Sequence, residues 1–343
     1  MGFNQTILTS STVNATLEIN VAEDLEDRIN PAVYVAAAFT LGIIGFFGFT
    51  LNLLVAVIII SDPQALWTPV NIILLNMVIG DFLVAAIGNP LAMASAITGG
   101  WYWDHEICLW YAWFMSTLGL ASICNLTVMA VERWLLVTRP MKALSLRHAG
   151  CLALSVWLYA LCLSLPPLLG WGSYGPEAGN VSCSVSWEVH DPATNSDSYI
   201  AFLFVFGLVI PVIVISASYA SILRTLKKVK KRAGSRGRRE AKVTKMVALM
   251  IIAFLVAWSP YATLALAAQY FHMKASPAVA ILPALLAKSS ICYNPVIYAG
   301  LNAQFPRSLK KRFGIRESTR RGQNLENTTT NMTLFRTEKT TND

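Results

Sequence analysis

Charged side chains are scarce in this sequence. Only 13% of its 343 residues are Asp, Glu, Lys or Arg, whereas 55% are hydrophobic. A soluble domain carries roughly 25% charged residues, because its surface must face water. The composition therefore excludes an ordinary soluble domain and indicates that much of the chain faces lipid.

The missing charges define seven long stretches. Asp81 is the only charged residue in residues 70–97, and Lys288 is the only one in residues 275–306. Five stretches have no charge at all, namely residues 32–61, 107–131, 151–172, 198–223 and 246–271. Every stretch exceeds the ~20 residues that an α-helix needs to cross a bilayer, whereas the strands of a membrane barrel are shorter and alternate in polarity. We therefore predict an all-α membrane protein, a bundle of seven transmembrane helices.

Basic residues are absent from some of the predicted loops and concentrated in others. Residues 173–197 contain four acids and no Lys or Arg, whereas residues 224–245 contain eleven basic residues and one acid, Glu240. The positive-inside rule then predicts an extracellular N-terminus. Residues 61–69 are an exception, since they contain Asp62 and no Lys or Arg. The net charge of +8 thus reflects membrane topology and contact with anionic lipid, not nucleic-acid binding.

The chain ends are polar. Residues 1–31 show no signal peptide and carry N-glycosylation sequons at Asn4 and Asn14, on the predicted outer side. Residues 314–343 are Thr-rich, which predicts a disordered cytoplasmic tail. Between them lies one seven-helix domain, residues 32–313.

A short amphipathic helix is predicted at the end of this domain. Phe305, Leu309 and Phe313 repeat every four residues beside a basic run, which is typical of a helix that lies at the membrane surface. The tail that follows contains no cysteine, so it offers no site for a palmitoyl anchor.

Cysteine is nearly absent from the loops. Of the six cysteines, four lie within predicted helices, where cysteine is commonly a small apolar residue. Cys108 and Cys183 are the only two on the oxidising side, so we expect a disulfide between them rather than two free thiols.

Lys288 is the most informative charged residue. A charge inside a bilayer costs at least ~2.5 kcal/mol, so something must offset it. In one interpretation, desolvation favours a neutral amine that can form a Schiff base with a carbonyl compound. In the other, the ammonium group pairs with an acid elsewhere in the bundle. The position of Lys288 alone does not decide between them.

A set of motifs in a fixed order decides between these two interpretations of Lys288. Its members are Asn52, Asp81, Cys108, Glu132-Arg133-Trp134, Trp157, Pro211, Tyr219, Trp258-Ser259-Pro260-Tyr261 and Asn294-Pro295-Val296-Ile297-Tyr298. Over residues 32–313 this set resembles the rhodopsin-like receptors and, within them, the animal opsins. Lys288 lies six residues before Asn294, where opsins carry the lysine that binds retinal.

The segment after the seventh helix resembles one branch of the animal opsins in particular. Asn302-Ala303-Gln304-Phe305 resembles the ciliary-type, non-visual and bistable opsins of the encephalopsin and pteropsin branch. Ala303 stands where that branch usually has lysine, which weakens any transfer of its G-protein preference.

The resemblance implies a retinal site inside the bundle. Lys288 would hold 11-cis-retinal through a Schiff base in the dark, and the retinal would become all-trans after light. Aromatic residues of helix six would form one wall, and residues of helix three would form the other. The expected wall residues are Phe254, Trp258 and Tyr261 on helix six, and Tyr111, Ser116 and Gly119 on helix three.

A protonated Schiff base needs a counter-charge. Vertebrate visual pigments place a glutamate three residues after the disulfide cysteine, where this chain has Tyr111. Glu177, six residues before Cys183, matches the counterion position of many invertebrate and non-visual opsins. We therefore expect Glu177 to be the counterion, with Asp104 and Glu106 as weaker alternatives.

The resemblance also implies an activation switch on the cytoplasmic side. Arg133 would pair with Glu240 in the dark, the alternative being that Glu240 is a stray acid in a solvated basic loop. Three prolines would kink helices five, six and seven, namely Pro211, Pro260 and Pro295. The other expected members of the switch are Glu132, Trp134, Tyr219, Asn294 and Tyr298, and an internal polar network would join Asn52, Asp81 and Asn294.

The implied function is that of a light-sensing plasma-membrane receptor, not an enzyme, with retinal as cofactor and no metal. A ciliary or photoreceptor membrane is one expected setting. We expect it to activate a Gi/o or transducin-like heterotrimeric G protein, to be bistable, and to be recognised by a receptor kinase and arrestin. The candidate phosphorylation sites are Ser318, Thr319, Thr328, Thr329, Thr330 and Thr333. A retinal photoisomerase and a ligand-gated receptor of the same fold are the alternatives.

Overall fold

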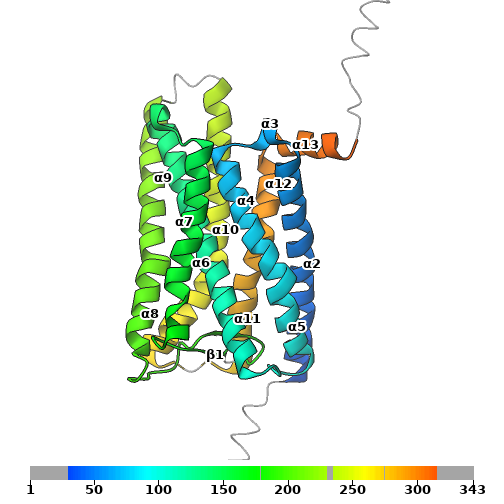
Figure 1. The fold of residues 1–343 in the computed structure, drawn as a ribbon, viewed down its shortest axis with the longest axis vertical. Coiled ribbons are helices and arrows are strands. Elements are labelled where there is room, and N and C mark those ends of the chain that lie inside the picture. Colours follow the sequence, from blue (N-terminus) through cyan, green and yellow to red (C-terminus); the bar gives the residue numbers. More distant parts are fainter. Residues whose placement is uncertain (1–29, 178, 230–234, 274, 315–343) are drawn as a thin grey trace, which may run out of the picture.

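Seven helices that are long and apolar enough to cross a membrane dominate the described part of the chain. The structure, a computed structural model, describes residues 30–177, 179–229, 235–273 and 275–314. Figure 1 shows the helices side by side in a bundle, with the short helix α13 (Phe305–Arg312) projecting sideways from one end. The predicted all-α fold is confirmed. The predicted sites at Asn4 and Asn14 and in the tail beyond residue 314 lie outside the described residues and stay predictions.

Each span covers most of one predicted stretch. The spans are α2 (Pro31–Ser61), α4–η1–α5 (Pro69–Leu83, Val84–Gly88, Asn89–Ile97), α6 (His105–Thr138), α7 (Leu146–Ser164), α8–η4–α9 (Ser196–Phe204, Val205–Val209, Ile210–Val229), α10 (Ser235–Phe271) and α11–η5–α12 (Pro277–Ser289, Ser290–Cys292, Tyr293–Leu301). Of these, α6, α9 and α10 extend beyond their predicted stretches at the cytoplasmic end, to Thr138, to Val229 and back to Ser235. Short helical turns also occur at α3 (Pro63–Leu66), η2 (Pro140–Lys142) and η3 (Pro166–Leu169).

The fourth span is shorter than predicted. The absence of charge suggested residues 151–172, but α7 ends at Ser164. Pro166 and Pro167 form the tighter turn η3 instead, since proline cannot donate to an α-helical hydrogen bond. Gly170 then ends η3 in the left-handed region, at φ 91°.

The three prolines that were predicted to kink their helices lie at or near irregular hydrogen bonding in helices five, six and seven. The π turn η4 ends two residues before Pro211, and the 3-10 turn η5 ends three residues before Pro295. Pro260 lies inside the continuous helix α10. Its missing N–H leaves the carbonyl of Val256 without its helical donor, and the hydroxyl of Ser259 donates to that oxygen at 3.0 Å.

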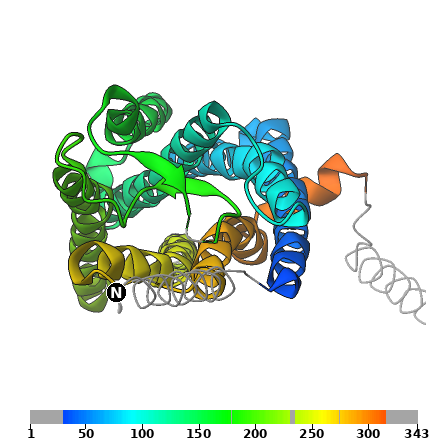
Figure 2. The ribbon, with the colours of Figure 1, turned by 90° about the horizontal axis from the view of Figure 1, so that it is seen from below.

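A two-stranded hairpin closes the extracellular end of the bundle. Strand β1 (Tyr174–Pro176) pairs antiparallel with β2 (Cys183–Val185). Cys183 forms the predicted disulfide with Cys108, which is buried near the start of α6. In Figure 2 the hairpin crosses the space that the helices surround. The disulfide therefore fixes residues of the loop over the bundle interior.

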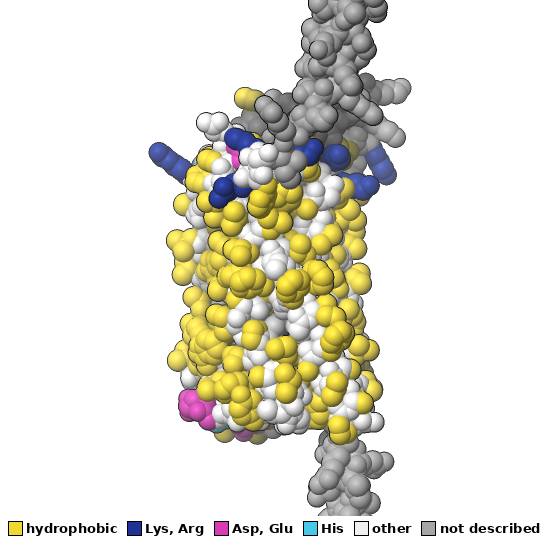
Figure 3. Space-filling model, turned by 90° about the vertical axis from the view of Figure 1, so that its right-hand side faces the viewer, with side chains coloured by type: hydrophobic (Ala, Val, Ile, Leu, Met, Phe, Trp, Pro, Cys, Tyr) yellow, Lys and Arg dark blue, Asp and Glu magenta, His cyan; other side chains and the backbone are white. Residues whose placement is uncertain are grey.

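Side-chain chemistry divides the surface into zones. Figure 3 shows hydrophobic side chains along the flank of the bundle, with Lys and Arg gathered at one end and acidic side chains at the other. This distribution agrees with the predicted topology, in which the basic end lies inside the cell.

Asp62 lies in the loop of residues 61–69, which contains no Lys or Arg. Its hydrogen-bond partners lie on α13 (Phe305–Arg312). Ser308 Oγ donates to its carboxylate at 2.8 Å and Lys311 Nζ at 3.2 Å. These two hydrogen bonds are the largest causes that lower the pKa of Asp62, so it is ionised at cytoplasmic pH. Phe305 is buried and anchors the predicted amphipathic helix, whereas Phe313 follows the helix and is exposed.

Candidate functional site

Lys288 lies in the last turn of α11, directly before the 3-10 turn η5. Its side chain is only 12% exposed. The Nζ atom donates to Ser182 Oγ at 3.0 Å and lies 3.8 Å from Glu177 Oε2. The fold thus brings the mid-membrane lysine and the predicted loop acid together.

Glu177 follows β1 directly, and the hairpin holds it in place. Its backbone N–H donates to the carbonyl of Ser182 at 2.8 Å. Ser182 Oγ also donates to Glu177 Oε2, and the Tyr261 hydroxyl donates to Oε1 at 3.2 Å. Asp104 and Glu106 are exposed at the start of α6, where Asp104 caps the backbone N–H of Ile107 at 2.9 Å. Geometry therefore favours Glu177 over both alternatives.

Two opposing effects set the pKa of Glu177. Burial acts to raise it, because a charged carboxylate is poorly solvated there. The ammonium group of Lys288 and hydrogen bonds from Ser182, Ser184 and Tyr261 together outweigh burial, so the pKa lies below its ordinary value. Glu177 is therefore ionised at neutral pH and becomes neutral only as the pH falls through this lowered pKa.

The three aromatic residues predicted on helix six pack against one another on α10. The ring of Trp258 stacks on Phe254 with centroids 5.5 Å apart and meets Tyr261 edge-on at 6.0 Å. Trp258 Nε1 donates to Ser290 Oγ in η5 at 3.1 Å. A Cβ atom at Gly119 would lie 3.1 Å from the Trp258 ring, so this close approach favours glycine on α6.

The other two predicted residues of α6 lie nearer its extracellular start, where Tyr111 shares a buried cluster with Tyr174 and Cys183 of the hairpin. Tyr111 is buried and packs against Trp101 at 5.1 Å between ring centroids. Its hydroxyl has no hydrogen-bond partner among the described residues. Ser116 hydrogen-bonds to Tyr174 of β1. These contacts place all three predicted residues of helix three beside the hairpin or Trp258.

Two residues that sequence reasoning missed complete this site. Ser182 joins Lys288 to Glu177, and Trp187 donates from its indole nitrogen to the Tyr261 hydroxyl at 3.0 Å. The adjacency of Ser182 to Cys183 was the one available signal, since the disulfide fixes its neighbours over the bundle.

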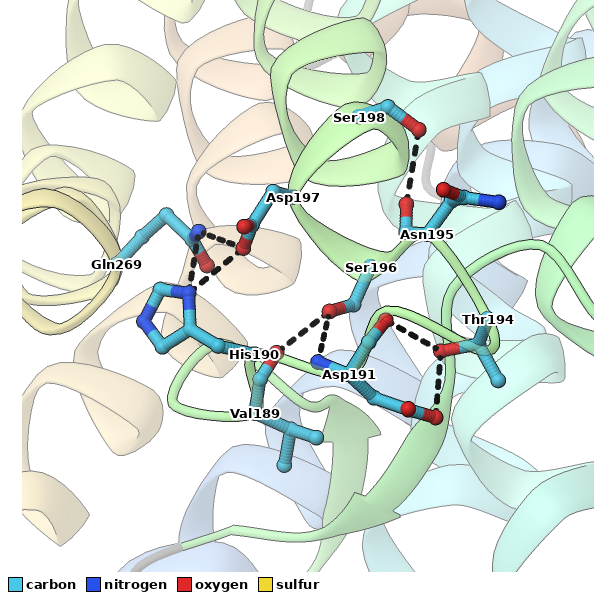
Figure 4. Close-up of polar contacts among 9 residues, drawn as sticks. All are labelled: Val189, His190, Asp191, Thr194, Asn195, Ser196, Asp197, Ser198 and Gln269. Carbon is cyan, nitrogen blue, oxygen red and sulfur yellow. Dashed lines mark hydrogen bonds and ion pairs between the residues drawn. The ribbon is translucent and has the colours of Figure 1, made fainter.

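A separate polar cluster lies further out, between the loop after β2 and the ends of α8 and α10 (Figure 4). His190 Nδ1 contacts Asp197 Oδ1 at 2.6 Å, and Gln269 Nε2 donates to the same oxygen at 2.7 Å. Across the described ranges, no group of three or more His, Cys, Asp or Glu residues is placed to hold a metal ion. The cluster therefore ties loop and helices together.

The predicted ion pair on the cytoplasmic side is present. Arg133 is buried, pairs with the neighbouring Glu132, and donates from Nη1 to Glu240 Oε2 on α10 at 3.1 Å. Trp134 and Tyr219 make further contacts between helices. The Trp134 indole donates to Ser221 Oγ at 3.0 Å, and the Tyr219 hydroxyl donates to the Thr244 carbonyl at 3.2 Å.

The internal polar network is present in part. Asn294 Nδ2 donates to Asp81 Oδ2 at 3.1 Å. Asn52 instead donates to the Ile291 carbonyl in η5 at 3.0 Å, so it joins the network through the backbone. Tyr298 is buried against Phe305, with ring centroids 5.3 Å apart.

Comparison with known proteins agrees with this geometry. Residues 51–298 match the family model of the 7 transmembrane receptor (rhodopsin family), which defines the class. Pinopsin from Columba livia is 34% identical over 81% of this chain and 81% of the relative, and opsin-3 from Mus musculus is 36% identical over 82% and 71%. The crystal structure of squid rhodopsin superposes with a TM-score of 0.77 at 27% identity, covering 84% of this chain and 87% of that one. The chain belongs to the opsins, within the rhodopsin family of seven-transmembrane receptors.

Proposed function

We propose that this opsin senses light through retinal bound covalently at Lys288 and passes the signal to a Gi/o or transducin-like heterotrimeric G protein. The observation that carries the proposal is the amine of Lys288, on a side chain only 12% exposed, 3.8 Å from the carboxylate of Glu177. The relatives of this chain are receptors rather than enzymes. As a multi-pass receptor of this family, the protein belongs in the plasma membrane.

The residues present fit retinal. A primary amine, an ionised acid and the aromatic rings of Trp258 and Tyr261 lie together, and the Trp258 ring packs directly against Gly119. Retinal, when bound through its aldehyde carbon to the Lys288 nitrogen, supplies visible absorption and a light-driven change from the 11-cis to the all-trans shape. Glu177 and Ser182 would hold the proton on that nitrogen, because a buried positive charge needs a nearby acceptor and a counter-charge.

Replacement of Lys288 tests the attachment directly. Lys288→Ala removes the buried amine, so we expect no retinal adduct that borohydride can trap. Lys311→Ala, which changes a lysine on α13, serves as control and should retain the full adduct. Covalent labelling of the Lys288→Ala protein in the same yield would refute the assignment.

Replacement of Glu177 tests the counter-charge. Glu177→Gln should lower the affinity of the Lys288 nitrogen for its proton by about 1 to 3 pKa units, the range expected for a close opposite charge. The visible absorption of the pigment should then move toward the ultraviolet at neutral pH. Glu188→Gln, an exposed acid of the same loop, should change nothing. An unchanged spectrum for Glu177→Gln across pH would point to another anion.

The proposal that the pigment is bistable rests on which residues near Lys288 could accept the proton from its nitrogen. Tyr111 is a neutral phenol with a free pKa of ~10 and cannot readily take the proton from the Lys288 nitrogen. Glu177 is ionised and held by the hairpin, so it can stabilise that proton before and after light. Irradiation at the dark-state maximum and then at the maximum of the product should restore the first spectrum without added retinal. Irreversible bleaching within minutes would contradict this proposal.

Coupling to the inhibitory G-protein class rests on the ciliary-type resemblance. We expect light to lower cAMP in cells that express the protein, and pertussis toxin should abolish the response. Parallel recording of calcium separates the classes, since a light-driven calcium rise insensitive to the toxin would indicate Gq and a rise of cAMP would indicate Gs. Lys288→Ala is the control that separates a light response from basal signalling.

A further inference from the structure

Two chains of hydrogen-bond donors end on the carboxylate of Glu177. In the first, Lys288 Nζ donates to Ser182 Oγ, which donates to Oε2. In the second, Trp187 Nε1 donates to the Tyr261 hydroxyl at 3.0 Å, which donates to Oε1 at 3.2 Å. Each carboxylate oxygen therefore accepts from a separate relay, and Trp187 begins the second one.

The chemistry of Trp187 gives this second relay a fixed direction. An indole N–H can only donate, whereas a phenol has one proton and two lone pairs. With one lone pair of Tyr261 occupied by Trp187, the phenol proton must point elsewhere, and its two partners are Glu177 and Ser184, the latter at 3.1 Å. The charged oxygen of Glu177 is the stronger acceptor.

Packing holds the indole of Trp187 in place. Its ring meets Tyr261 edge-on, at 6.2 Å between centroids and 80° between planes, and lies 5.6 Å from Phe204 on α8. The titratable groups that face Glu177 come from three helices, namely Lys288 on α11, Tyr261 on α10 and Tyr111 on α6. In such a buried setting, each donor polarises the next and strengthens the final bond to the carboxylate.

We propose that Trp187 is a positioning residue, which holds the Tyr261 hydroxyl in the orientation that donates to Glu177 and thereby keeps Glu177 ionised opposite Lys288. The functional meaning of this inference rests on the proposed role of Glu177 as counter-charge. Without the indole N–H, the phenol proton turns to Ser184 in part of the molecules, and Glu177 binds a proton more easily.

The test uses the full-length protein without retinal, so that it does not depend on covalent attachment. Infrared spectra across an acid titration report the carboxyl stretch of Glu177, which is identified as the signal absent from Glu177→Gln. Trp187→Phe should raise the midpoint by about half a pH unit, or roughly threefold in proton affinity. Trp171→Phe is the matched control, because it removes an indole that donates to Ser198 at 2.8 Å, away from Glu177.

A double-mutant cycle checks that the effect passes through Tyr261. Tyr261→Phe should itself raise the midpoint, and adding Trp187→Phe should then change it no further. Should Trp187→Phe fold poorly, replacing Trp187 with benzothienylalanine removes only the N–H and keeps the ring. An unchanged midpoint in this isosteric variant, or an equal shift with and without Tyr261, would overturn the proposal.

The pigment gives an independent readout. With retinal added, Trp187→Phe should move the acid-induced change of the absorption maximum to higher pH, in parallel with the infrared midpoint, and Trp171→Phe should not. If no retinal attaches to Lys288 in the unmodified protein, the proposed function fails, whereas the titration without retinal still decides the role of Trp187.

Discussion

A charge buried in the bilayer must be neutralised inside the protein, and this constraint organises the whole bundle. Three ionisable groups within the described spans have polar partners: Asp81 with the amide of Asn294, Arg133 with Glu132 and Glu240, and Lys288 with Ser182 and Glu177. Because lipid offers no alternative partner, each of these contacts fixes how two elements meet. The partners of Lys288 differ from the others because they belong to a loop and not to a helix. A disulfide and a hairpin hold this loop inside the helical ring.

The features predictable from sequence were those that depend on composition along the chain. The absence of charge places the seven spans, and the positions of Cys108 and Cys183 on the oxidising side give the disulfide that the structure contains. Lys288 could be assigned a carbonyl ligand only through the resemblance of the surrounding motifs. The end of helix four was misplaced because the apolar run continues past Pro166, where the backbone can no longer form an α-helix.

What sequence could not supply is the path of the loop between α7 and α8. Ser182 and Trp187 carry no periodic pattern, and their partners Lys288 and Tyr261 are far along the chain. Their roles depend on a hairpin register that pairs Pro176 with Cys183 and so sets Glu177 beside Ser182. A shift of that register by one residue would turn these side chains to the other face, away from the amine. The disulfide excludes such a shift by fixing Cys183 to α6.

Helix α10 connects the two ends of the molecule. Near its extracellular end, Tyr261 donates to Glu177, and near its cytoplasmic end, Glu240 accepts from Arg133 of α6. Pro260 lies between these two contacts, where Ser259 rather than the backbone satisfies the carbonyl of Val256. The helix is therefore held at both ends and has a weakened hydrogen bond between them. Glu177, the acceptor of Tyr261, is also the counter-charge beside Lys288, and Pro260 is the point where α10 lacks a backbone hydrogen bond. Pro260 thus lies on a helix that contacts both the polar site under the hairpin and the ion pair at the cytoplasmic surface.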